Sequence, residues 1–298
     1  MKLWELLHSV PLTGETPELD MEINSISYDT RTLEPGALFA ALPGARDDGA
    51  RYIREALDRG AAAVLCRERP EEDGPWLVTP DPRRALALLS ANWFGRPAEG
   101  LTLVGVTGTN GKTTTTTLLA ELLQRKRPNA RAAGNIGVPL SEIVREQGDQ
   151  KTDIALEVAA FQLVAMEKFH PVVSVCMNLT PDHLDYFGSL DAYYEAKMRV
   201  WKNQRDDDWF LMNLDDPEIV RRCADLPCRG VTFSLNQPAD LCLRQDQVWL
   251  FDQPLFALSD LHLPGKHNLQ NAMVAAAMAV KMGVSADQIR AGIQAFKG

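Results

Sequence analysis

The feature that most constrains the fold is the stretch from Leu101 to Leu119, which reads LTLVGVTGTNGKTTTTTLL. Its first part, Leu101 to Val106, is a short apolar run rich in β-branched residues, which is typical of a buried parallel strand. A tight glycine-containing turn follows, and the residues from Lys112 onward are typical of a helix. A strand, a glycine-rich turn and a helix that opens with Gly-Lys-Thr form a cradle for phosphate groups. The sequence therefore predicts a site for a nucleoside triphosphate.

In such a cradle, the N–H groups of the turn and of the helix N-terminus point at anionic oxygens. Lys112 adds a positive charge for the β- and γ-phosphates, and the hydroxyl of Thr113 can ligate Mg²⁺. The common pattern has a glycine five residues before Gly111, where this chain has Val106, and an ordinary glycine-rich turn is the alternative. The residues expected to line the nucleotide site are Gly108, Thr109, Asn110, Gly111, Lys112, Thr113 and Thr114.

The chain is long enough, at 298 residues, for two domains with separate cores. Its formal net charge of −9 argues against a nucleic-acid-binding surface. No apolar run reaches the length of a membrane span, and the first ten residues are not a convincing signal peptide. The five cysteines lack the spacing of a zinc site. We therefore expect a cytoplasmic protein with reduced cysteines and without nucleic-acid or membrane partners.

Residues 1–98 have the pattern of a separate small α/β domain, followed by a linker rich in glycine and proline at residues 95–100. Two polar clusters in this domain, residues 28–31 and residues 44–49, follow predicted strands. Ligand-binding loops occupy such positions in α/β sheets. Solvated turns are the alternative interpretation of each cluster.

Residues 99–298 alternate strands with helices, which predicts a mostly parallel sheet with right-handed crossovers. Short alternating strands between Val231 and Leu263 predict a small antiparallel addition. We call the predicted turn at Thr107 to Gly111 the phosphate loop. Glu157 and His183 follow predicted strands, so we expect them at the same sheet edge as this loop. Glu157 and the hydroxyl of Thr113 are hard oxygen ligands suited to Mg²⁺, whereas His183 is either a further ligand or a structural histidine.

Two further candidates lie on predicted helices. Lys197 shares a helix face with Tyr193 and Tyr194, and it is either a site residue or a surface lysine whose stem lies on the protein. Asn268 and Asn271 are spaced to share one face at a helix start. They could bind the edge of an adenine, or they could cap the helix.

Five motifs together resemble those of the Mur ligases of peptidoglycan synthesis, in order and in spacing. They are residues 107–113 (TGTNGKT), 134–137 (GNIG), 178–185 (NLTPDHLD), 194–197 (YEAK) and 265–271 (GKHNLQN). The second predicted domain, residues 99–298, most resembles the family members that add D-glutamate, and the shared residues include FQL at 161–163. The first domain instead resembles the UDP-muramoyl domain of the members that add the third amino acid, through residues 29–31, 35–39 and 48–49.

The resemblance implies an enzyme that uses ATP to phosphorylate the terminal carboxylate of a UDP-N-acetylmuramoyl peptide. The amine of an incoming amino acid, best assigned as D-glutamate, then attacks the acyl phosphate. Lys112 and Thr113 would hold the triphosphate and a first Mg²⁺, together with Glu157. The lysine that Lys197 matches is carbamylated in the family, and with His183 it would hold a second Mg²⁺.

The resemblance also implies contacts with the two large ligands. Asn135 would contact the muramoyl substrate, and Asn271, with Asn268 beside it, would contact the adenine. In the first domain, the residues expected near the uridine diphosphate are Thr30, Arg31 and Asp48.

Two departures from the family pattern qualify this prediction. The family usually has Ser-Ser after the acidic metal ligand, where this chain has Ala159-Ala160, so the grip on the substrate is expected to be weaker. The chain also stops where the family's third domain, which binds the incoming amino acid, would begin. We therefore expect ligand binding without efficient ligation, unless a separate C-terminal domain or partner chain supplies the rest.

Three alternatives remain open from the sequence. The first is a ligase that adds a diamino acid or L-lysine, as the first domain suggests. The second is a relative of folylpolyglutamate synthase, which shares the central domain. The third is a non-catalytic protein that binds a nucleotide or a muropeptide.

Overall fold

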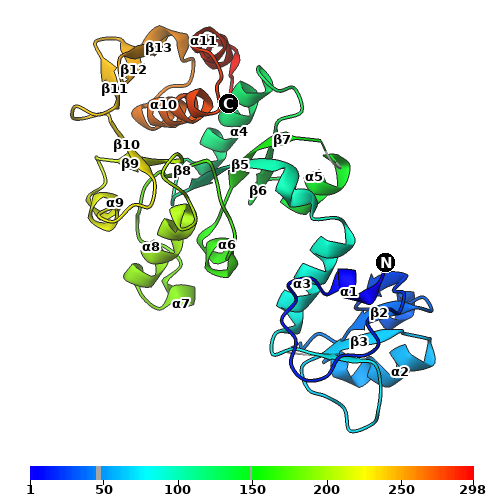
Figure 1. The fold of residues 1–298 in the computed structure, drawn as a ribbon. Helices are drawn as coiled ribbons and strands as arrows, with labels where there is room; N and C mark the ends of the chain where they lie inside the picture. Colours follow the sequence, from blue (N-terminus) through cyan, green and yellow to red (C-terminus); the bar gives the residue numbers. More distant parts are fainter. Residues whose placement is uncertain (45–47, 148–149) are drawn as a thin grey trace. The chain divides into compact units, whose positions relative to one another are not determined.

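The computed structural model describes residues 1–44, 48–147 and 150–298 and divides the chain into two units, Met1–Glu99 and Gly100–Gly298 (Figure 1). Part of the polar cluster predicted at residues 44–49, namely residues 45–47, lies outside the described residues. Over the described ranges, no helix has the length and apolar character needed to cross a membrane.

The first unit is built on a four-stranded parallel sheet in the order β1-β2-β3-β4. The central strands are apolar throughout because both of their faces are covered: Leu38 and Leu65 pack in one cluster, and Phe39 and Val64 pack in another. The strands are β1 (Ser25–Ser27), β2 (Ala37–Ala40), β3 (Ala63–Cys66) and β4 (Trp76–Val78), and the helices are α1 (Leu3–Leu6), α2 (Ile53–Asp58) and α3 (Pro82–Trp93).

The second unit is built on a nine-stranded sheet in the order β13-β12-β11-β10-β9-β8-β5-β7-β6. The strands from β6 to β11 pair in parallel, and β11, β12 and β13 pair antiparallel. The predicted α/β fold, a mostly parallel sheet with an antiparallel addition, is confirmed. The strands are β5 (Leu101–Thr107), β6 (Arg131–Gly134), β7 (Thr152–Glu157), β8 (Val173–Cys176), β9 (Trp209–Asn213), β10 (Arg229–Ser234), β11 (Leu241–Arg244), β12 (Gln247–Leu250) and β13 (Gln253–Ala257).

Helices cover both faces of this sheet. One face carries α4 (Lys112–Gln124), α10 (Lys266–Lys281) and α11 (Ala286–Ala295). The other face carries α6 (Ala160–Ala165), α8 (Leu190–Met198) and α9 (Pro217–Arg222). Two more helices, α5 (Leu140–Gln147) and α7 (Leu184–Phe187), follow β6 and β8.

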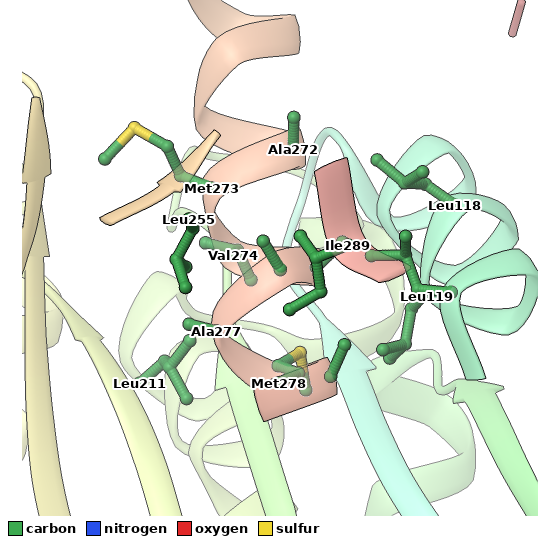
Figure 2. Packing of buried hydrophobic residues seen from close by; sticks show 14 of the residues in the cluster. Leu118, Leu119, Leu211, Leu255, Ala272, Met273, Val274, Ala277, Met278 and Ile289 are labelled. Carbon is green, nitrogen blue, oxygen red and sulfur yellow. The ribbon is translucent and has the colours of Figure 1, made fainter. Parts of the chain in front are cut away.

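Helix α10 is buried around nearly its whole circumference between Leu269 and Ala279. Its alanines let it lie close to the elements around it, since a helix that is apolar on all sides must be enclosed. Figure 2 shows Met278 and Ala277 of this helix among side chains that include Leu119 of α4 and Leu211 of β9. This packing fixes the start of α10 close to the start of α4.

The chain order of the sheet determines where a ligand site can form. Strand β5 lies between β7 and β8, and the chain runs from β5 to β6 on one side and later to β8 on the other. Such a switch in direction leaves a crevice at the carboxyl ends of the strands, which is where open α/β sheets bind ligands. The phosphate loop follows β5 at this switch point.

Candidate nucleotide and cation site

The phosphate loop requires glycine at two positions. Gly108 has a φ of 138° and Gly111 a φ of 82°, which side chains rarely tolerate. A Cβ on Gly108 would lie 2.9 Å from the Cβ of Met177, and a Cβ on Gly111 would lie 2.5 Å from Oδ1 of Asn271. The loop therefore approaches both the end of β8 and the start of α10 more closely than any other residue would permit.

The end of the loop presents N–H donors that have no partner in the described part of the chain. Gly111 is the N-cap of α4 and has no side chain to cap the helix, so the first N–H groups of α4 have no partner within it. Lys112 at the first helical position is bonded back onto the loop, with its Nζ donating to the carbonyl of Thr109 at 2.9 Å. The helix dipole and this ammonium both favour an anion at this point.

A hydroxyl, a carboxylate and an amide meet at the ends of neighbouring strands. Thr113 Oγ1 donates to Glu157 Oε2 at 2.8 Å, and Asn135 Nδ2 donates to Glu157 Oε1 at 3.1 Å. Glu157 ends β7, the neighbour of β5, and is only 3% exposed. A buried carboxylate in contact with a hydroxyl fits a hard cation, because Mg²⁺ takes oxygen ligands and usually completes its shell with phosphates and water.

Among the described residues, no group of three or more His, Cys, Asp or Glu side chains could hold a metal ion by itself. A cation beside Glu157 would therefore depend on the Thr113 hydroxyl and on oxygens supplied by the nucleotide. This dependence is typical of Mg²⁺ in nucleotide sites.

Lys197 of α8 points inward to the phosphate loop. It is 3% exposed, and its Nζ donates to the carbonyl of Gly108 at 2.7 Å. The same Nζ lies 4.7 Å from the centre of the Tyr193 ring. Burial, with a smaller contribution from the nearby charge of Lys112, lowers the pKa of this amine to about 8. The alternative of a surface lysine is wrong, because the amine is enclosed.

His183 also contacts the ring of Tyr193. Its ring centre is 5.8 Å from that of Tyr193 and 4.9 Å from that of Phe161. The backbone at His183 is left-handed, with a φ of 50°, which places its side chain at the start of α7. The side chain is 46% exposed, and Nε2 lies 3.5 Å from Asp182. The structure thus places His183 and Lys197 around one aromatic ring.

The two asparagines of α10 have different surroundings. Asn271 is 4% exposed and lies against Gly111 of the phosphate loop. Asn268 is half-buried, and its Nδ2 donates to the carbonyl of Pro264 at 2.8 Å, within the turn that leads into the helix. The structure therefore places Asn271 at the candidate site, whereas Asn268 stabilises the start of α10.

The candidate residues of the first unit lie beyond the ends of β1 and β2, which pair in parallel and so share a sheet edge. Thr30 is buried, and Arg31 forms a 2.6 Å ion pair with Asp29. This bond and the N–H of Arg31 lower the pKa of Asp29 to about 2. Asp48 caps a short 3₁₀ helix by accepting from the N–H of Ala50 at 3.0 Å.

One residue of the site carried no predicted role. Asn178 follows β8, and its side-chain Oδ1 accepts from the N–H groups of Thr109 at 3.1 Å and Asn110 at 2.8 Å. Its Nδ2 donates to the carbonyl of Asn110 at 3.2 Å. The signals in the sequence are an amide shortly after an apolar strand and its place as the first residue of the motif at residues 178–185.

Comparisons with known proteins agree on one family. A family model described as Mur ligase middle domain matches residues 106–279, and one described as Mur ligase family, catalytic domain, matches residues 22–93. A UDP-N-acetylmuramoyl-L-alanyl-D-glutamate–2,6-diaminopimelate ligase from Syntrophomonas wolfei is 32% identical over 332 residues, covering 100% of this chain and 67% of that protein. A UDP-N-acetylmuramoylalanine–D-glutamate ligase from Lacticaseibacillus casei is 36% identical over 224 residues, covering 74% of this chain and 46% of that protein.

The fold is also found among solved structures. A crystal structure of MurF ligase from Thermotoga maritima in complex with ADP has a TM-score of 0.65 at 21% identity, covering 95% of this chain and 68% of that one. The chain therefore spans about two thirds of the length of some of these relatives and about half of the length of others.

Proposed function

Because the chain belongs to the Mur ligase family, we propose that it supplies the UDP-substrate and ATP-binding parts of an ATP-dependent ligase of peptidoglycan precursor synthesis. The observation that carries the proposal is the bond between Thr113 and the buried Glu157 beside the phosphate loop. It gives the loop both a place for phosphates and a place for their cation. An ordinary structural turn has no need for a buried carboxylate at that position.

For ATP, this chain offers the free N–H groups at the start of α4, the ammonium of Lys112 and the amide of Asn271. On binding of a triphosphate, Lys112 exchanges the carbonyl of Thr109 for a phosphate oxygen, which is the stronger acceptor because it is charged. Thr113 and Glu157 would hold Mg²⁺, which neutralises charge on the phosphates when bound. An ADP complex of the related ligase from Thermotoga maritima supports nucleotide use in this fold.

Lys197 and His183 would serve the acyl-transfer end of the site. A carbamate forms when a neutral amine adds to CO₂ and loses a proton, so a lysine whose pKa is lowered by burial is the suitable starting group. The resulting group is carboxylate-like and could hold a second Mg²⁺ together with His183. Asn135, bonded to Glu157, would then lie beside the muramoyl end of the substrate.

The substrate is proposed to be a UDP-N-acetylmuramoyl peptide. Thr30, Arg31 and Asp48 lie on loops at the carboxyl edge of the first unit's sheet, where an α/β sheet binds its ligand. The side chain of Arg31 is 84% exposed, and a diphosphate would compete with Asp29, which accepts from its Nε and Nη2.

For the added amino acid, we favour D-glutamate, because a D-glutamate ligase is 36% identical over 224 residues, against 32% over 332 residues for a diaminopimelate ligase. The second candidate is a diamino acid or L-lysine. It is favoured by the match of the diaminopimelate ligase over the whole of this chain. In either case, a third domain or a partner chain would supply the contacts to the incoming amino acid.

A non-catalytic role in binding nucleotide or muropeptide is the remaining alternative, and Ala159-Ala160 supports it. Helix α6 begins there without a hydroxyl cap, and Gln162 Oε1 accepts the N–H of Ala159 at 2.9 Å instead. The loss of two hydroxyls weakens the polar grip on a substrate.

Calorimetric titration tests the proposal. UDP-N-acetylmuramoyl-L-alanine and its D-glutamate-extended form are each added to the chain with Mg²⁺ and a non-hydrolysable ATP analogue, with Lys112→Met as the nucleotide-site control. Binding of the shorter form alone supports addition of D-glutamate, and a preference for the extended form supports addition of the next amino acid. Absence of nucleotide binding, or equal binding by Lys112→Met, would reject the assigned site.

A further inference from the structure

The loop that joins β5 to α4 does not direct all of its N–H groups toward a ligand. The N–H of Asn110 donates to Asn178 Oδ1 at 2.8 Å, and the N–H of Thr109 donates both to this oxygen and to the Asn178 carbonyl, each at 3.1 Å. These bonds turn the first half of the loop toward the end of β8. Among the described residues, the N–H groups of residues 111–114 have no such acceptor and remain for an anion.

A second set of bonds strengthens the same attachment. Thr109 Oγ1 donates to the carbonyl of Thr180 and accepts from the N–H of the same residue, both at 3.2 Å. Gly108 lies in close contact with Met177, and its carbonyl accepts from Lys197 at 2.7 Å. The segment from Gly108 to Asn110 is thus bonded to residues that follow β8 and to Lys197 of α8.

We propose that Asn178 is a positioning residue for the nucleotide: its amide holds the phosphate loop open by engaging the backbone of Asn110 on both its N–H and its carbonyl. A phosphate group is then bound by the donors at the start of α4 and not by those of Thr109 and Asn110. Without the amide, the N–H of Asn110 loses its acceptor, and the loop gains alternative conformations whose ordering opposes binding. This inference rests on the proposed nucleotide site.

The N–H groups of Asn110 and Thr109 should respond differently to a change at Asn178, so each variant can be tested at both positions. Replacing Asn178 by alanine removes the acceptor of the Asn110 N–H but leaves the backbone carbonyl that accepts from Thr109. Asn178→Asp retains an acceptor oxygen. Asn203→Ala is the matched control, because Asn203 Nδ2 also holds a loop by donating to two carbonyls, those of Glu167 and Phe169, both at 2.8 Å.

The first measurement is amide hydrogen exchange of the ligand-free chain, followed residue by residue by NMR. We expect the Asn110 N–H to be protected in the wild-type chain, in Asn178→Asp and in Asn203→Ala, and to exchange at least about tenfold faster in Asn178→Ala. The Thr109 N–H stays protected in all four. An Asn110 N–H that exchanges freely in the wild-type chain, or equally in all variants, overturns the proposal.

The second measurement is the affinity for ADP with Mg²⁺, together with exchange in the bound state. We expect Asn178→Ala to weaken ADP binding at least about tenfold and Asn203→Ala to change it less than about twofold. ADP should add protection at residues 111–114 and leave that of Asn110 unchanged. An equal loss of affinity in both alanine variants would make Asn178 merely structural. If the wild-type chain binds no ADP, the proposed function fails. The exchange of the Asn110 N–H still decides whether Asn178 holds the phosphate loop.

Discussion

Replacing the buried Lys197 by methionine is expected to stabilise the protein while removing a site residue. Burial lowers the pKa of the amine from 10.5 to about 8. At about 1.4 kcal/mol for each tenfold change in the protonation equilibrium, the folded protein carries a charging penalty of about 3 kcal/mol at pH 7. Methionine has a similar length and no charge, but it loses the bond from the charged amine to the Gly108 carbonyl, worth about 2 kcal/mol. The net gain in unfolding free energy is about 1 kcal/mol.

The pH dependence of this gain has a definite sign. Between about pH 8 and 10.5, the unfolded chain keeps the lysine proton whereas the folded chain releases it, so wild-type stability rises with pH through this window. Below about pH 8 the penalty is fully present. The advantage of Lys197→Met should therefore be largest at pH 7 and should decline as the pH approaches 10.5.

The assay is urea unfolding of both proteins at several pH values in buffers freed of CO₂, because a carbamate would change the charge of the amine. Equal m-values are required for the two midpoints to be compared. A methionine variant that is less stable than the wild-type chain at pH 7, by an amount that does not vary with pH, would refute the reasoning. The surroundings of Lys197 would then stabilise its charged form, and the charge would not lower the stability of the folded protein.

Three further predictions concern the core and the cation. Leu119→Ala should lower the unfolding free energy by about 2–5 kcal/mol in urea, since Leu119 is fully buried; a loss below about 1 kcal/mol would contradict the packing of α4. Thr116→Val should raise it by about 1 kcal/mol in the same assay, because the buried Thr116 hydroxyl has no hydrogen-bond partner in the described part of the chain; destabilisation would reveal one. Glu157→Gln should abolish the Mg²⁺ enhancement of ADP affinity in calorimetry while leaving metal-free binding unchanged, and an unaltered Mg²⁺ dependence would exclude Glu157 as a ligand.

The central sheet and the position of its loop could be predicted from local patterns. The β-branched run before Thr107 and the glycines after it determine a strand and a turn through short-range sterics. The rule that ligands gather at the carboxyl ends of parallel strands was enough to bring Glu157 to the loop. The contact between Thr113 and Glu157 follows from the adjacency of β5 and β7.

The remaining features of the site depend on contacts that no local pattern encodes. Helical periodicity placed Lys197 beside Tyr193 but did not determine whether the amine turned to solvent or to the Gly108 carbonyl. The attachment of Asn178 to the loop requires β8 to lie next to β5, which is a property of the strand order. The spacing of Asn268 and Asn271 suggested a pair, yet Asn268 lies in the first turn, where the nearest acceptor is the Pro264 carbonyl.

The placement of β5 between β7 and β8, with Asn271 of α10 against Gly111, has a consequence for folding. The nucleotide loop is a local segment, but its geometry is complete only after strands from both sides of the sheet and a helix from far along the chain have docked. A chain truncated before α10 should therefore have no functional loop. The loop should also form slowly during folding, because its contacts join residues that are far apart in the sequence. Because a nucleotide would bind only the folded loop, it would oppose unfolding of the whole second unit. Its affinity would therefore depend on the folding of this unit as well as on the direct contacts in the site.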